Sequence, residues 1–307
     1  MERIKRLKFS SGSYSLLLGY TLAVLGSASY GLNPLFALPL YDIGVSPMNV
    51  LFYRYIISAL LMGFWIIIRK GSFRLTMKEA MLTFVMGLMF AASSVSLFYS
   101  FKFIDAGLAS VILFTYPLFV ALLSWLVFHE HMSRGTFLCI VVALFGICLL
   151  DQGSTSGGIN ITGMSLAVLS GLTYAFYLIG ANRSVMKTMD ASKLSFYTLF
   201  FGTIMFFIAN DFGQDLIILP NAKAWSDAFG LSIFPTIISL VLITRAIHLI
   251  GSTPTSIIGA LEPITALFIS LTVFGGVLTG MNIVGIMMIL GAVVFMIYSN
   301  NKRAKTA

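Results

Sequence analysis

A single acidic residue, Glu262, interrupts the long apolar stretch near the C-terminal end of the sequence. It precedes Pro263 in the segment IIGALEPITALFIS, and no other residue between 246 and 299 carries a full charge at neutral pH. A carboxylate in such a setting can bind a cationic or amino group of a substrate, or it can carry a proton. It can equally cap a kinked helix or pair with Arg245 during assembly, and both interpretations stay open.

Other polar residues could complete a substrate site. Arg54 could bind a substrate carboxylate with two hydrogen bonds, although a guanidinium that extends to the lipid headgroups is the simpler expectation. Arg245 could form an inner gate with Glu262. Aromatic and amide side chains would suit an amphipathic substrate, although tyrosine is also a passive anchor at membrane interfaces. The candidates of this kind are Tyr30, Asn33, Tyr99, Tyr116, Tyr174 and Tyr177.

The cluster of His129, Glu130 and His131 resembles a metal site only at first sight. Adjacent and i+2 residues do not share a helix face, and the spacing fits zinc patterns poorly. We therefore expect neither a metal nor another cofactor.

The composition indicates a membrane protein. The 307 residues are 58% hydrophobic and 10% charged, whereas soluble domains are about half apolar and a quarter charged. Apolar segments of about 20 residues, the length of a membrane-spanning helix, recur along the chain. We predict an all-α integral membrane protein with ten transmembrane helices. These are residues 14–37, 47–68, 79–101, 107–128, 134–150, 162–182, 192–210, 225–247, 253–274 and 279–299.

The basic residues predict the orientation. With the N-terminus inside, sixteen of the 19 Lys and Arg residues fall in inner segments, Lys102 and Lys223 fall in outer ones, and Arg54 lies within a span. This asymmetry predicts a multi-pass protein of the cell membrane with both termini in the cytoplasm. Contact with anionic lipid headgroups accounts for the net charge of +8, so no nucleic-acid partner is expected.

The two halves of the sequence resemble each other. GYTLAVLGSASYG, which begins at Gly19, matches GMSLAVLSGLTYA, which begins at Gly163, and SVILFTYP (110–117) matches SIIGALEP (256–263). Each half has an odd number of spans, so the second must cross the membrane in the opposite sense. We expect two inverted five-helix repeats, residues 14–150 and 162–299. Such repeats are typical of secondary transporters, which bind substrate near mid-membrane at the repeat interface.

Pro117 and Pro263 occupy matched positions in the fourth and ninth spans. Each removes a backbone donor and interrupts its helix, and matched interruptions are the best sequence pointer to a transport site. At 1.5 Å per residue, Glu262 lies roughly 14 Å deep, near the middle of a ~30 Å core. Its counterpart in the first half is Tyr116. We predict that both prolines act as hinges.

Three segments carry a family resemblance: SPMNVLFYRYIISALL (46–61), FTYPLFVALLSWLVFHE (114–130) and GALEPITALFISLTVFGG (259–276). On these segments the sequence resembles the EamA-type transporters of the drug/metabolite transporter superfamily, over essentially its whole length. The resemblance implies a carrier, often an exporter, of small metabolites such as amino acids, nucleotides or amphipathic compounds. Both halves of such proteins often end their fourth span with a glutamate; here Glu130 fits this pattern and Gly276 departs from it.

We therefore expect a secondary transporter that exports a small amino acid-like or amphipathic metabolite by alternating access, as a monomer or a homodimer. No nucleotide-binding motif is recognisable, so the driving force would be proton coupling through Glu262, solute exchange or facilitated diffusion. The alternatives are an intramembrane enzyme, for which no convincing catalytic triad is seen, and a channel or a non-transporting receptor.

Overall fold

The computed structural model describes residues 2–129, 132, 134–151, 160–181, 189–250 and 252–304, and all regular elements in these ranges are helices. Within them, 9 helices or helix pairs are long and apolar enough to cross a membrane, and Arg134–Leu150 is a shorter apolar helix. These ten segments confirm the predicted spans, mostly to within three residues at each end. The largest difference is at the first span, which continues to Asp42.

The first half contains five spans, of which the first and the fourth are each made of two helices. The elements are α1 (Glu2–Tyr30) with α2 (Asn33–Asp42), α3 (Pro47–Ile68), α4 (Met77–Ser100), α5 (Ala106–Leu113) with α6 (Tyr116–Phe128), and α7 (Arg134–Asp151).

The second half has the same order of spans, and its third and fourth spans are the interrupted ones. The elements are α8 (Ile161–Ala181), α9 (Ala191–Ala209), a 3-10 turn η2 (Asp211–Gly213), α10 (Ala222–Ser232) continued by the π-helix η3 (Ile233–Ile238) and α11 (Ser239–Ile250), α12 (Ser252–Ile258) with α13 (Leu261–Val273), and α14 (Gly280–Ala304).

Helix starts follow ordinary capping chemistry. Ser46 accepts a hydrogen bond from the Asn49 backbone ahead of α3, and Thr76 with Glu79 forms a capping box at the start of α4. Asp105 caps α5 and accepts a further hydrogen bond from the Ser270 hydroxyl of α13. Because cap side chains satisfy the free N–H groups of the first turn, they fix where each helix begins.

The helices pair mainly between the two halves. α3 packs against α9, α5 against α13, α7 against α14, α1 against α11, and α4 against α8. If each span is replaced by its counterpart in the other half, the α1–α11 pair becomes the α8–α4 pair and the other three pairs stay the same. The packing therefore follows a two-fold relation between the repeats.

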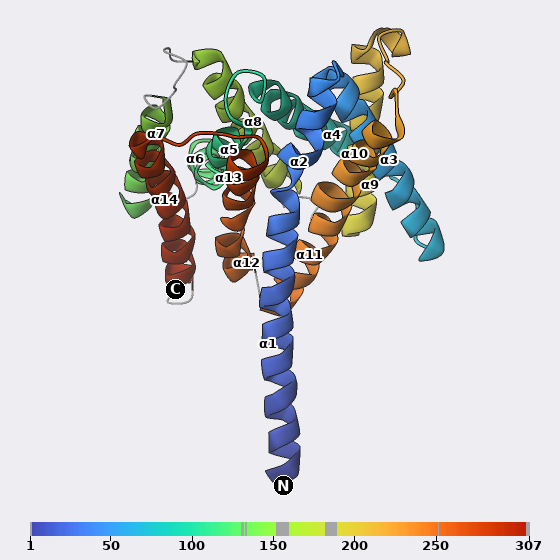
Figure 1. The fold of residues 1–307 in the computed structure, drawn as a ribbon. Coiled ribbons are helices and arrows are strands. Elements are labelled where there is room, and N and C mark those ends of the chain that lie inside the picture. Colours follow the sequence, from blue (N-terminus) through green and yellow to red (C-terminus); the bar gives the residue numbers. More distant parts are fainter. Residues whose placement is uncertain are drawn as a thin grey trace.

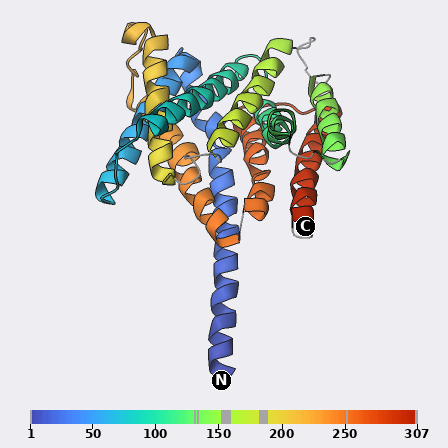
Figure 2. The same cartoon turned by 180° about the vertical axis from the view of Figure 1, so that it is seen from behind.

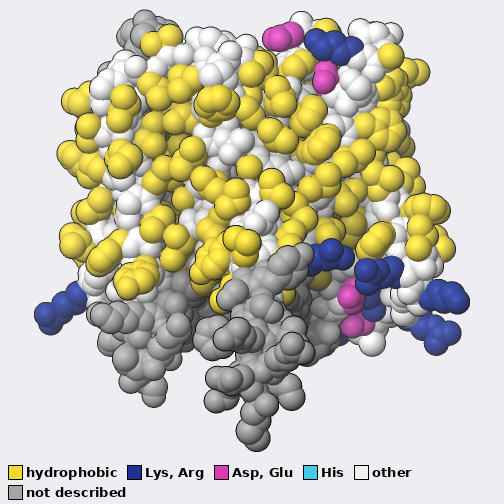
Figure 3. All heavy atoms as spheres, turned by 60° about the horizontal axis from the view of Figure 1, so that its bottom comes forward, with side chains coloured by type: hydrophobic (Ala, Val, Ile, Leu, Met, Phe, Trp, Pro, Cys, Tyr) yellow, Lys and Arg dark blue, Asp and Glu magenta, His cyan; other side chains and the backbone are white. Residues whose placement is uncertain are grey.

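The two halves run through the molecule in opposite directions (Figures 1 and 2). The chain enters from the lower side through α1, α7 ends and α8 begins at the upper side, and α14 returns to the lower side. A space-filling view shows a broad hydrophobic belt, with Lys and Arg side chains gathered along the lower rim (Figure 3). The belt is the surface expected of a protein that is solvated by lipid.

Candidate functional site

Two helix interruptions lie at matched positions in the fourth and ninth spans. α5 ends at Leu113 and α6 restarts at Tyr116, with Pro117 in its first turn. α12 ends at Ile258 and α13 restarts at Leu261, with Glu262 and Pro263 in its first turn. The prolines thus begin new helices, where a missing backbone N–H costs nothing.

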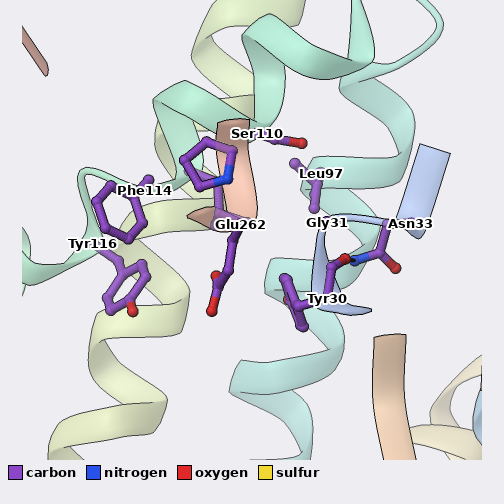
Figure 4. A pocket seen from close by; sticks show the side chains of 10 residues that line it. Tyr30, Gly31, Asn33, Leu97, Ser110, Phe114, Tyr116 and Glu262 are labelled. Carbon is purple, nitrogen blue, oxygen red and sulfur yellow. Dashed lines mark hydrogen bonds between the residues drawn. The ribbon is translucent and has the colours of Figure 1, made fainter. Parts of the chain in front are cut away.

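A small cavity of about 10 Å³, room for about one water molecule, lies beside these interruptions (Figure 4). It brings together residues of α1, α2, α4, α5, α6 and α13 and the turns between them, so both repeats contribute to its wall. The lining residues are Tyr30, Gly31, Asn33, Leu97, Ser110, Leu113, Phe114, Tyr116, Glu262 and Pro263.

Glu262 supplies the acidic group of this cavity. It is partly buried near the middle of the span Pro254–Val273. Its carboxylate points into the space between the Tyr116 and Tyr30 rings (Figure 4). Among the described residues it forms no ion pair and no side-chain hydrogen bond, and the pairing with Arg245 is absent because Arg245 is exposed on α11.

Tyrosines surround the carboxylate. Tyr30 and Tyr116 line the cavity, and Tyr174 meets the Tyr116 ring edge-on, with ring centroids 4.9 Å apart. Tyr177 stacks on Tyr174 at 5.9 Å. The hydroxyls of Tyr30, Tyr116 and Tyr174 are all within electrostatic range of Glu262. Four of the candidates therefore converge, whereas Tyr99 is absent from the cavity wall.

Arg54 is buried in the protein interior, with 2% of its surface exposed. Its Nε donates to Thr236 Oγ1 of η3 at 3.0 Å, and its guanidinium lies 5.4 Å from the Phe98 ring centroid. The expectation that this guanidinium extends to the lipid headgroups is therefore wrong. The polar contact to Thr236 explains why it can stay inside, since a buried charge needs hydrogen-bond partners.

Tyr30 connects the basic and the acidic groups. It interacts electrostatically with both Arg54 and Glu262. Arg54 itself is absent from the cavity wall. Asn33 also lines the cavity; its Nδ2 donates to the Tyr30 carbonyl at 2.8 Å, while its buried Oδ1 has no hydrogen-bond partner among the described residues.

Several residues at the site were missed by sequence reasoning. Gly31 brings the turn between α1 and α2 against α13: a Cβ there would lie 2.5 Å from the Glu262 carbonyl oxygen. Thr236 and Phe98 hold Arg54. None of these residue types is unusual in a membrane helix, and only the matched Tyr30 and Tyr174 positions carried a usable signal. Of the suspected metal cluster, Glu130 and His131 lie outside the described residues.

Comparison with known proteins gives the family. The sequence matches the EamA-like transporter family over residues 17–150 and 161–298. The chain belongs to this family. It is thus an EamA-type member of the drug/metabolite transporter superfamily, whose two five-helix units correspond to the two halves seen here.

Curated relatives agree with this assignment. The chain is 29% identical to the uncharacterized transporter sll1319 of Synechocystis over 66% of its own length and 62% of that protein. It is 23% identical to the uncharacterized transporter YdfC of Bacillus subtilis over 95% and 92% of the two lengths. Human solute carrier family 35 member G1 is 21% identical over 90% of this chain and 77% of that protein.

A solved crystal structure shares the fold, with a TM-score of 0.64 and 14% identity over 96% of this chain and 99% of that one. By its family match and its curated relatives, the EamA-type chain is a multi-pass membrane transporter of the drug/metabolite type.

Proposed function

We propose that this EamA-type protein is a secondary carrier that moves a small metabolite across the cell membrane by alternating access. The observation that supports this most is the cavity between the two repeats, which holds an unpaired carboxylate near mid-membrane. A carboxylate facing lipid at this depth would cost at least about 3 kcal/mol. Glu262 avoids this cost by facing the cavity.

The moving parts would be the two repeats, residues 14–150 and 162–299. The helix interruptions before Pro117 and Pro263 lie at the cavity and supply points where each fourth span can change direction. Rocking of one repeat against the other around a fixed site is the usual mechanism of transporters with this architecture.

The orientation proposed is with both termini in the cytoplasm, supported by the basic rim on the side where both termini lie (Figure 3). Arg183 and Lys187, which contribute to the basic bias in the sequence, lie outside the described residues. Export is the proposed direction, and it rests on the family resemblance alone.

Counterflow in proteoliposomes tests the carrier. Vesicles loaded with one of a panel of amino acids and amines should accumulate the same labelled solute from outside, with saturation. Glu262→Gln should lower the rate at least tenfold, and Asp227→Asn on α10 is the matched control, which should leave it unchanged. Unsaturable flux with ionic conductance would show a channel instead, and ligand binding without counterflow would show a receptor.

Proton coupling through Glu262 is the proposed driving mode. The wild-type rate should depend on an imposed pH gradient, and Glu262→Gln should abolish this dependence in whatever flux remains. A pH dependence that is the same in both proteins would remove the proton role and leave solute exchange or facilitated diffusion.

A further inference from the structure

We propose that the Glu262 cavity selects organic cations: small protonated amines with an apolar or aromatic body. The inference rests on the proposed function for the location of the substrate. It adds the chemical class of that substrate, which the charged, polar and aromatic groups of the cavity wall indicate.

The cavity has a carboxyl group without a counter-charge. Glu262 lies in the first turn of α13, where the helix dipole is favourable for a carboxylate. No described basic side chain pairs with Glu262. Arg54 is absent from the cavity wall and donates a hydrogen bond to Thr236, and Arg245 is exposed. A buried charge is tolerated only with a partner. A cationic ligand would be that partner.

The amide group of the cavity wall belongs to Asn33. Asn33 Nδ2 is already engaged with the Tyr30 carbonyl, whereas Asn33 Oδ1 is buried and has no hydrogen-bond partner among the described residues. An ammonium group is a donor with no acceptor. It therefore matches the Glu262 carboxylate, and a carboxylate ligand does not.

Aromatic rings enclose the same space. Tyr30 and Tyr116 line the cavity, and Tyr174 supports the Tyr116 ring from behind. Ring faces attract cations, and most strongly where water is excluded. Leu97, Leu113 and Phe114 make the rest of the wall apolar. The cavity thus combines a charge for the ammonium with apolar surface for its substituent.

The charge balance separates this class from zwitterions. An amino acid would place its own carboxylate in a cavity that already contains Glu262 and no basic side chain. The described conformation therefore favours an amine over the amino acid of the same side chain.

The test uses four probes of nearly equal shape on the purified full-length protein in detergent. These are 2-phenylethylammonium, neutral 2-phenylethanol, anionic 3-phenylpropanoate and zwitterionic phenylalanine, each titrated by calorimetry. The inference predicts saturable binding of the ammonium at least tenfold tighter than of the other three. Equal or tighter binding of any other probe, or no saturable binding of the ammonium, would overturn it.

Variants locate the interaction. Glu262→Gln should weaken ammonium binding at least tenfold. Tyr116→Leu should weaken it several-fold, whereas Tyr116→Phe keeps the ring and should bind nearly as well as the wild type. Asp227→Asn is the control for a general loss of negative charge. Unchanged affinity in Glu262→Gln would refute the site, and the wild-type probe comparison decides the class even if a variant does not fold.

Counterflow separates this inference from the carrier proposal. Ammonium binding without counterflow of any solute would contradict the carrier and leave the cation site standing. Counterflow of an anionic or zwitterionic solute, with no ammonium binding, would contradict the cation site and leave the carrier standing.

Discussion

The two equivalent helix crossings of the repeat, α4–α8 and α1–α11, are built differently. At α4–α8, Ser93 Oγ donates to the Ser170 carbonyl at 3.0 Å and Ser170 Oγ donates to the Ser93 carbonyl at 2.8 Å. The matched residues of α1–α11 are Gly26 and Ser239, which form no such pair. Next to Gly26, the buried Ser27 Oγ has no hydrogen-bond partner in the described part of the chain.

The helices of the two crossings also differ in regularity: α4–α8 is the regular crossing and α1–α11 is the irregular one. α4 and α8 are continuous, whereas the first span is interrupted between α1 and α2 and its partner contains the π-helix η3. Ser29 Oγ of α1 donates to the Phe234 carbonyl inside η3 at 2.7 Å, which satisfies a backbone group of the irregular segment. Such π segments occur frequently at functional sites.

The repeat sets which helices pair, while the residues at matched positions of the two crossings differ in how they meet the cavity. The irregular crossing contributes Tyr30, Gly31 and Asn33 to the cavity. In the regular crossing, Tyr174 and Tyr177 stand at the positions of Tyr30 and Asn33. They lie behind the cavity wall, where they pack against Tyr116 and each other.

The largest effect is expected from Gly31→Ala. Ala175 stands at the matched position of α8, but a Cβ at Gly31 would lie 2.5 Å from the Glu262 carbonyl oxygen and 2.6 Å from Thr265 Cβ. Such overpacking should lower the free energy of unfolding in detergent by about 3 kcal/mol. The control is Gly291→Ala, which meets no atom within 4 Å. Equal stability of both variants would remove the steric basis of the comparison.

A smaller loss is expected from Thr236→Val in η3. It removes the 3.0 Å hydrogen bond from Arg54 Nε and leaves a buried charge with one partner fewer. The free energy of unfolding should fall by about 2 kcal/mol. Thr244→Val removes only a bond to the Leu240 carbonyl within α11 and serves as the control. If η3 did not depend on Arg54, the two variants would lose the same free energy of unfolding.

The smallest effect is expected at the regular crossing. A double-mutant cycle of Ser93→Ala and Ser170→Ala should give a coupling free energy of about 0.6 kcal/mol, as is usual for hydrogen bonds between membrane helices. Ser239→Ala, at the position matched to Ser93, should cost less than Ser93→Ala. A coupling near zero would show that the reciprocal serine bonds do not distinguish the crossings.

The sequence alone was sufficient to predict the ten spans, because apolar runs of membrane length are a strong signal. Glu262 was also predictable as a site residue, since a lone charge in such a run stands out. The interruption after Tyr30 was not predictable: it comes two residues ahead of Asn33, with no proline before Pro34. It follows from the close approach of Gly31 to α13, which is a tertiary contact.

The burial of Arg54 was unpredictable for a similar reason. Its hydrogen-bond partner Thr236 is 182 residues away in the sequence. Thr236 is accessible to it only because η3 crosses beside α3. Leu97, Leu113 and Phe114 have types found throughout membrane helices, so their place in the cavity wall also required the structure. The repeat did indicate Tyr30, Tyr116, Glu262 and Pro263 of the wall, because each stands at a matched position of the two halves.

The most direct test of the account is whether the Glu262 cavity opens to each side of the membrane in turn. Ser110 lines the cavity and can be replaced by Cys in a Cys139→Ser, Cys148→Ser background, with that background as the control. We predict that a membrane-impermeant maleimide labels Ser110→Cys both in right-side-out and in inside-out vesicles, which show no ionic conductance. Labelling from one side only, from neither side, or together with ionic conductance would contradict alternating access.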